Sequence, residues 1–468
     1  MDYQRCADLH NEILRRGYKG GAHTWPDPAL KTWWEQEAPS QETASRLSPS
    51  LIEFLKRAYM PYRGGGPQSL FFYISWIPSA QDMLDDIFIR SLRDDYDLGS
   101  YVLLYRWVYT HSSESFGLVF NLQTSKAVFV ANHLELLEIA RYSQTWMPLE
   151  TILAGYIDMI DDGKVVAIPN CDEETPGVPE WPIPSAPWIL HIYTGSDVRK
   201  AALAMKRLLD AIDARIESNA INHDGGAGEL ETPATEYAYL PWNDPAALPA
   251  NLVPKKTFAY RFLYSIRRFK VRFRYVAPGV RFPTLEEFLA QRAPVPAWQR
   301  AGQHSLRILH VEQPEEDSIK DKNNDREEKK EESKPLKITD RKYPGLYIEQ
   351  VIPSSDFLFS NECRLELPFG IGANGWARQS NGQPLGYNIW AGEPVPADST
   401  WDLYQSGNPT GWTDIRLVQI HKVLENWAER VESGDWDVDE QGVVGGSGKF
   451  READTEEGWR KYWIPLSW

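Results

Sequence analysis

Cysteine is scarce in this sequence. Its 468 residues include three cysteines, Cys6, Cys171 and Cys363, and no two of them are close in the chain. This spacing excludes a disulfide framework and a cysteine-rich zinc site. The nine histidines are scattered, with none paired at metal-ligand spacing on a helix, and neither a P-loop nor a G-x-S-x-G motif is present. The sequence therefore predicts no metal site and no cofactor, and it assigns no catalytic residue.

Long apolar runs are missing as well. No stretch reaches the roughly 18 apolar residues that a membrane-spanning helix needs. The N-terminus, MDYQRCADLHNEILRRG, has no apolar core of the kind found in secretory signals. We therefore expect a cytoplasmic protein without a membrane partner.

Apolar residues recur with both strand and helix periodicity in the first half of the chain. Four β-rich runs are predicted to be strands, and they cover residues 69–77, 100–110, 116–122 and 127–132. The third and fourth are separated by QTSK, which is typical of a hairpin. Helices are predicted at 48–58 and 147–163, then from Asp197 to about Glu217, and finally a C-terminal helix with Thr413 as its cap. This mixture predicts an α+β fold with a mixed or antiparallel sheet and packed helices.

Three of these segments together resemble a known superfamily. They are LSPSLIEFLKRAY with the following GGG, then LVFNLQTSKAVFV, then WMPLETILAGYIDMI. Over roughly residues 40–165 this order is similar to the SUKH superfamily of α+β interaction modules, with Leu47-Ser48-Pro49 in place of the family's Leu-Pro. The resemblance implies a helix, then a twisted sheet, then an aromatic-led helix on the sheet. It implies protein binding and transfers no catalytic residue.

Composition shifts divide the chain into regions. Residues 222–235 are rich in Gly and polar residues, and 315–334 are densely charged with Ile319 as the one apolar residue. A segment with so little to bury cannot offset the entropy of ordering. We expect an N-terminal α+β domain at 1–221, a basic-strand region at 236–310, a disordered linker at 315–334 and a C-terminal region at 340–468 that packs back on the body.

Positive charge is concentrated in one segment of this acidic chain. Residues 245–285 hold nine Lys or Arg and no Asp or Glu, so the other 427 residues must sum to -25 to give the net charge of -16. Within it, IRRFKVRFRY (266–275) alternates cations with apolar residues, as a strand with one basic and one apolar face would. A row of cations at this spacing suits a phosphate backbone. The predicted polyanion-binding residues are Lys255, Lys256, Arg267, Arg268, Lys270, Arg272 and Arg274.

The same alternation has a second interpretation. A surface strand in so acidic a chain can pair its cations with carboxylates of the chain itself, and a row of cations also discourages edge-to-edge aggregation. Both interpretations stay open from the sequence alone.

Two further motifs fail on their context. FGIGANG (369–375) matches G-x-G-x-x-G, but Gly382, Pro384 and Gly386 break the helix that must follow, so a turn-rich loop is predicted. Asp435, Asp437 and Asp439 resemble the start of a calcium loop, but Glu440 and Gly446 occupy positions that require Gly and Glu.

Two functions remain from the sequence. One is a protein that faces RNA or another polyanion, including a tRNA-dependent enzyme of the aminoacyl-transfer or cyclodipeptide-forming type; a class of fungal cyclodipeptide synthases has this size. The other is a non-catalytic SUKH-like module that binds another protein or regulates it. The basic segment favours the first, and the lack of a catalytic motif favours the second.

Overall fold

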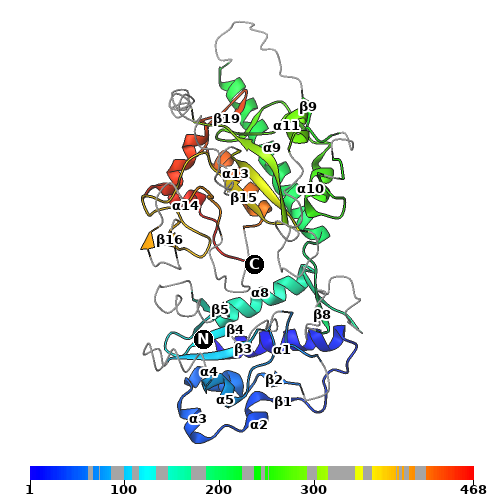
Figure 1. Ribbon diagram of the computed structural model, residues 1–468, viewed down its shortest axis with the longest axis vertical. Coiled ribbons are helices and arrows are strands. Elements are labelled where there is room, and N and C mark those ends of the chain that lie inside the picture. The colour runs from blue at the N-terminus through cyan, green and yellow to red at the C-terminus, as the bar shows by residue number, and fades with distance from the viewer. Residues whose placement is uncertain are drawn as a thin grey trace, which may run out of the picture.

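The computed structural model describes most of the chain. The described residues are 1–61, 67–72, 74–85, 100–107, 115–132, 146–169, 186–223, 237–243, 248–250, 252–291, 303–314, 343–351, 361–385, 387–388, 393–394, 400–405 and 418–468. They form two lobes, coloured blue to cyan and green to red in Figure 1. None of the helices in these ranges is both long enough and apolar enough to cross a bilayer.

The first lobe is built on a four-stranded antiparallel sheet in the order β3-β4-β5-β6. Helix α8 packs against α1 and against the β5–β6 edge of this sheet, and α1 also contacts α4. The elements of this lobe are α1 (Tyr3–Gly20), β1 (Lys31–Thr32), α2 (Trp33–Glu37), α3 (Gln41–Ser45), α4 (Pro49–Leu55), β2 (Tyr59–Met60), α5 (Ala80–Asp85), β3 (Tyr101–Arg106), β4 (Ser115–Asn121), β5 (Lys126–Asn132), β6 (Met147–Pro148), α8 (Leu149–Asp161), β7 (Val165–Ala167) and β8 (Trp188–Leu190).

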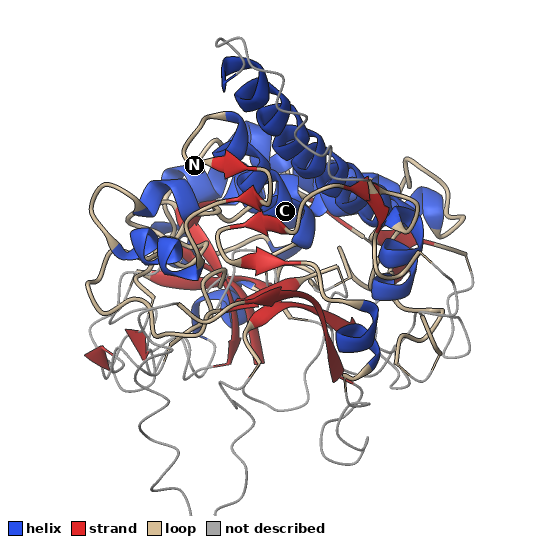
Figure 2. Cartoon of the chain, turned by 90° about the horizontal axis from the view of Figure 1, so that it is seen from above, coloured by secondary structure: helices blue, strands red, loops and turns tan. Residues whose placement is uncertain are grey.

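The second lobe has a seven-stranded sheet in the order β15-β14-β13-β12-β11-β19-β18, in which only the β11–β19 pair is parallel. The long helix α9 packs along α13 and against β11, β18 and β19, and it crosses the top of the view in Figure 2. The elements are α9 (Gly195–His223), β9 (Ala238–Tyr239), α10 (Phe258–Ile266), β10 (Lys270–Val271), β11 (Tyr275–Ala277), β12 (Val280–Arg281), α11 (Leu285–Leu289), β13 (Gln303–Val311), β14 (Gly345–Val351), β15 (Cys363–Glu366), β16 (Tyr387–Asn388), β17 (Glu393–Pro394), α13 (Ile420–Glu432), β18 (Val438–Asp439), β19 (Gly442–Val443), the 3-10 helix η3 (Ser447–Asp454) and α14 (Trp459–Tyr462).

Each lobe has its own apolar core. One core comprises buried residues from Cys6 to Leu190, and the other comprises residues from Ala201 to Ile464. Helix α9, which lies in the expected domain 1–221, buries its apolar face in the second core. The expected regions 236–310 and 340–468 share that core, while the linker 315–334 lies outside the described residues.

The α+β prediction is confirmed, and most predicted elements occur. The helices at 48–58 and 147–163 are α4 and α8, and the QTSK hairpin joins β4 to β5. The predicted strand 69–77 is wrong, because in its described part only Ile74 pairs, in an isolated bridge to Trp107. The predicted cap Thr413 is also wrong, because α13 starts at Ile420 with Gln419 as its N-cap.

The two lobes meet at a buried polar contact. Lys164, which lies between α8 and β7, places its ammonium 3.0 Å from the carboxylate of Asp197 in the first turn of α9. Asn361, next to β15, accepts a hydrogen bond from Lys164 at 3.0 Å and donates one to Asp197 at 3.2 Å. Three distant segments are thereby joined at one point.

Candidate functional site

The basic segment 266–275 is not one continuous strand, which corrects the sequence-based expectation. Its first residue ends α10, whose Phe258, Phe262 and Ile266 are spaced four apart and are fully buried. This helical stripe extends α10 into the segment, and the backbone then turns, with the Phe269 amide donating to the Ile266 carbonyl at 2.9 Å. Only two residues pair as β10 with β9.

The two predicted faces nevertheless exist. Val271 and Phe273 are buried, and Phe269 packs against the same core. Arg268, Lys270 and Arg274 are exposed, and Arg272 is half-buried. The alternation of buried and exposed side chains is retained although only Lys270 and Val271 lie in a strand and the backbone bends at Arg272.

Arg272 is neutralised within the chain. Its guanidinium lies 2.6 Å from the Asp213 carboxylate and 3.2 Å from that of Glu217, both on α9. The Tyr237 hydroxyl donates to the other oxygen of Asp213 at 2.6 Å, and the Tyr237 ring lies beneath the Arg272 guanidinium. For this cation the intramolecular interpretation is the one that the contacts support.

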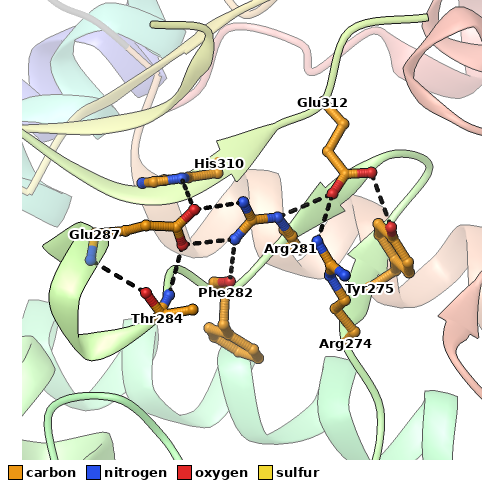
Figure 3. A network of polar contacts seen from close by, with 8 residues as sticks. All are labelled: Arg274, Tyr275, Arg281, Phe282, Thr284, Glu287, His310 and Glu312. Carbon is orange, nitrogen blue, oxygen red and sulfur yellow. Dashed lines mark hydrogen bonds and ion pairs between the residues drawn. The ribbon is translucent and has the colours of Figure 1, made fainter. Parts of the chain in front are cut away.

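Arg274 also pairs internally, in the network that Figure 3 shows. Its guanidinium lies 2.8 Å from Glu312, which follows β13, and Arg281 reaches the same carboxylate oxygen at 2.9 Å. Tyr275 donates to the second Glu312 oxygen at 2.8 Å. Arg281 grips Glu287 with two further hydrogen bonds of 2.8 and 2.7 Å.

The ionisation of this network follows from its contacts. The hydrogen bonds from Arg281 hold the pKa of Glu287 at about 2. Burial, with the positive charge of Arg307 beside it, lowers the pKa of His310 to about 4. Glu287 is therefore charged and His310 neutral near pH 7. The charges of Arg274, Arg281, Glu287 and Glu312 are paired with one another, while the buried Nε2 of His310 has no hydrogen-bond partner.

Most of the remaining cations are exposed to solvent. Arg261 lies on the exposed face of α10, and Arg268, seven residues later, lies just beyond the end of this helix. Lys270 is exposed on β10. Arg267 is half-buried. Within the described part of the chain, no carboxylate lies within ion-pair distance of these four residues.

Lys255 and Lys256 lie at the opposite end of α10. Both are exposed just before Thr257, the N-cap of this helix. The nine-residue helix separates them from Arg267 by about 14 Å at a rise of 1.5 Å per residue. The structure thus divides the predicted set into a cluster at the C-terminal end of α10, a pair at its N-terminal end and two internally paired arginines.

Tyrosines accompany the cations at the C-terminal end of α10, and the sequence analysis did not identify them. The Arg267 guanidinium lies 3.6 Å from the centre of the Tyr264 ring, and the Lys270 ammonium lies 4.6 Å from that of Tyr239. Spacing along α10 could have indicated Tyr264. Nothing local could have indicated Tyr239, because it reaches the cluster only by the pairing of β9 with β10. We call Arg261, Tyr264, Arg267, Arg268, Lys270 and Tyr239 the basic-aromatic surface.

A cavity of about 700 Å³ adjoins the other end of the basic segment. Its walls include Tyr275, Glu312, the β11–β12 turn and the glycine-rich loop 444–448. Ser447 also lines it, and its hydroxyl donates to the carbonyl oxygen of Glu312 at 2.6 Å. In this structure the Ser447 hydroxyl is thus bonded to the backbone and not to a general base.

The G-x-G-x-x-G stretch forms a loop, as predicted, and the loop binds an anion from its own chain. The Asp454 carboxylate accepts from the backbone amides of Gly372 and Asn374 with one oxygen, and from those of Trp376 and Ala377 with the other, at 2.9–3.0 Å. The site that a phosphate would take in a dinucleotide-binding loop is filled by a buried side chain.

The calcium-like stretch is engaged in ion pairs. Asp435 lies 3.1 Å from Arg430 and 2.5 Å from Lys461. In the portions of the chain that the structure describes, no group of three or more His, Cys, Asp or Glu side chains could hold a metal ion.

No protein-family model, no curated protein and no solved structure matches this chain. The resemblance to the SUKH superfamily therefore stays a prediction, and function is inferred from geometry.

Proposed function

We propose that this protein binds RNA through the basic-aromatic surface. The observation that carries the proposal is the cluster of Arg261, Arg267, Arg268 and Lys270, which have no ion-pair partner among the described residues although the chain as a whole is strongly acidic. Exposed cations that the fold leaves without carboxylates are available to phosphates. Arginine also binds phosphate with a fork of donors.

Affinity and its salt dependence test this proposal. Replacing Arg261, Arg268 and Lys270 with Gln removes up to three phosphate contacts and leaves the buried side of the segment intact. Affinity for single-stranded RNA should fall, and the slope of log K against log salt should flatten by about 0.7 per lost contact, or about 2 in all. Purified protein should also carry RNA, visible as a raised 260/280 absorbance ratio that nuclease treatment lowers.

A matched control lies on the other lobe. Arg5, Lys31 and Lys126 are exposed there, and their replacement with Gln changes the net charge equally. If both triple variants lose the same affinity, the attraction is general and the proposed surface is wrong. Absence of RNA binding in the unaltered protein contradicts the proposal directly.

The finer proposal is a tRNA-dependent transferase, of the aminoacyl-transfer or cyclodipeptide-forming type. It is supported by the position of the cavity at the Tyr275 end of the basic segment, where an acceptor end could enter. Incubation with charged tRNAs should then remove the aminoacyl group. Stable aminoacyl-tRNA in the presence of the protein excludes this form of the proposal.

Protein binding by the first lobe is a second candidate function. It is supported by the order of α4, the antiparallel sheet β3–β6 and α8, which is the order that the SUKH resemblance implies. Capture of one specific protein by residues 1–190, in the context of the whole chain and in the presence of nuclease, would support it. Loss of that capture on nuclease treatment would show that RNA bridges the two proteins.

A further inference from the structure

Two tyrosines of the basic-aromatic surface are exposed without a structural reason. The Tyr239 side chain is 50% exposed and that of Tyr264 is 38% exposed. The largest buried aromatic residues, among them Trp33, Trp188 and Trp242, fill the cores, whereas these two tyrosines belong to a small set of exposed ones that also includes Tyr237 and Tyr343. Neither ring belongs to the apolar core, and each is accompanied by an exposed or half-buried cation.

Tyr264 is part of a stack that ends in the guanidinium group of Arg267. The Tyr260 and Tyr264 rings lie 5.8 Å apart at an angle of 12°. Arg267 follows at 3.6 Å, and its Nη1 donates to the Tyr264 carbonyl at 2.5 Å, which holds the guanidinium over the ring. A guanidinium plane fixed in this way is a surface on which a nucleobase stacks.

Tyr239 is held on a two-stranded ribbon. It is the register partner of Lys270 in the β9–β10 pair, and the Lys270 ammonium lies above its ring. This pair of residues thus presents an aromatic ring and a phosphate-binding charge side by side. Tyr237, which is also exposed, differs because its hydroxyl is bound to Asp213 and Glu217 lies close by. Negative charge around Tyr237 disfavours a nucleic acid there.

We infer that the basic-aromatic surface takes unpaired nucleotides, with bases stacked on Tyr239 and on the Tyr264–Arg267 pair and with phosphates on Arg261, Arg268 and Lys270. This inference rests on the proposed function. Stacking on an aromatic side chain accepts any base, since every base has a π face. A duplex hides these faces, so unpaired RNA binds more tightly than duplex RNA of equal charge.

The test separates base stacking from phosphate attraction. The probes are a 15-nucleotide oligouridine, an abasic ribose-phosphate oligomer of the same length and a duplex RNA. The variant is Tyr239→Leu with Tyr264→Leu, which keeps an apolar side chain at both positions. It should lose about tenfold or more in oligouridine affinity and nothing in abasic-oligomer affinity.

The control variant is Tyr343→Leu. Tyr343 is 52% exposed and the Arg307 guanidinium lies 5.3 Å from its ring centre, so it is a similar cation-covered tyrosine that is not one of the residues of the basic-aromatic surface. Its replacement should leave all three affinities unchanged. The melting temperature of each variant shows that a loss of affinity does not come from unfolding.

The outcomes are distinguishable. If the unaltered protein binds neither single strand, the proposed function fails. If it binds the abasic oligomer as tightly as oligouridine and the double Tyr variant is silent, the proposed function stands and the stacking inference is overturned. Equal loss of affinity for both probes also overturns it. Tighter binding of polyglutamate than of RNA identifies an acidic protein partner and overturns both.

Discussion

Lys164 and Asp197 form an ion pair that is almost completely withdrawn from water. Their side chains are 1% and 3% exposed, and the ammonium and carboxylate lie 3.0 Å apart. The Asp197 carboxylate also accepts hydrogen bonds from the backbone and hydroxyl groups of Thr194, which caps α9. One carboxylate therefore serves the start of α9 and the junction between the lobes.

Breaking this pair should be costly. Asp197→Asn leaves the Lys164 ammonium buried without a counter-charge, and loss of one partner of a buried ion pair costs about 3–5 kcal/mol. We expect this loss in the free energy of unfolding measured by urea denaturation. The control is Lys200→Met, which breaks the half-buried and far more solvated pair between Lys200 and Asp162 at 2.8 Å and should cost less than about 1 kcal/mol. Equal costs for the two variants would show that the junction is solvated.

The carboxylate of Asp454 should hold the loop 372–377 in place. Asp454→Asn replaces one accepting oxygen with an NH₂ group that faces amide donors, so the loss should be about 2–3 kcal/mol. Chemical denaturation measures it. Asp437 is exposed in the preceding hairpin, and Asp437→Asn is the matched control, with an expected change within about 0.5 kcal/mol. A silent Asp454→Asn would mean that the loop does not depend on the charge.

The stability of the protein should fall as the pH drops from 7 to 5. His10 is fully buried, its Nε2 donates to the Tyr59 carbonyl at 2.8 Å, and its Nδ1 accepts from the Tyr105 hydroxyl at 2.9 Å. Burial lowers the pKa of His10 from 6.5 to about 4. Between these two pKa values His10 is protonated in the unfolded chain and neutral in the folded protein. The stability that is present above pH 6.5 is therefore lost as the pH falls.

The magnitude expected from His10 is roughly 2 kcal/mol at pH 5. His310 has its pKa lowered in the same direction and adds to the slope, while Glu287, with a pKa of about 2, titrates below this range. His10→Gln should flatten the dependence of unfolding free energy on pH by about half, and His310→Gln should flatten it further; burial lowers the pKa of His191 as well, so part of the slope should remain. An unchanged slope in His10→Gln would show that His10 is protonated in the folded protein.

Replacing an internally paired cation of the basic segment should lower the free energy of unfolding more than replacing an exposed one. Arg272→Gln leaves Asp213 and Glu217 without their cation and should lower the free energy of unfolding by about 1 kcal/mol, because the Arg272 side chain is only 19% exposed. Arg268→Gln, on the exposed face, should change it by less than about 0.5 kcal/mol. Thermal denaturation of both variants checks this, and RNA affinity should respond in the opposite order. Equal destabilisation would mean that Arg268 also has an internal partner.

Sequence reasoning was most successful where the pattern is local. Helical spacing in the sequence predicts one apolar face from Leu149, Leu153, Tyr156 and Ile160. The first three are fully buried on α8, while Ile160 at the end of this face is only partly covered. It was least successful at 69–77, an apolar run that was taken for a strand. Apolar content indicates burial, but whether a buried run forms a ladder depends on a partner strand elsewhere in the chain.

By itself, the sequence determined the α+β class, the hairpin of β4 and β5 and the two faces of residues 269–273, since periodicity depends on neighbouring residues alone. The tertiary structure decided which charges are available. It brought Asp213 to Arg272 across 59 residues, Asp454 to Gly372 across 82, and Asn361 to Lys164 across 197. Every acidic residue is an equal candidate partner in the sequence, and only packing of the apolar faces selects the few that come within hydrogen-bonding distance.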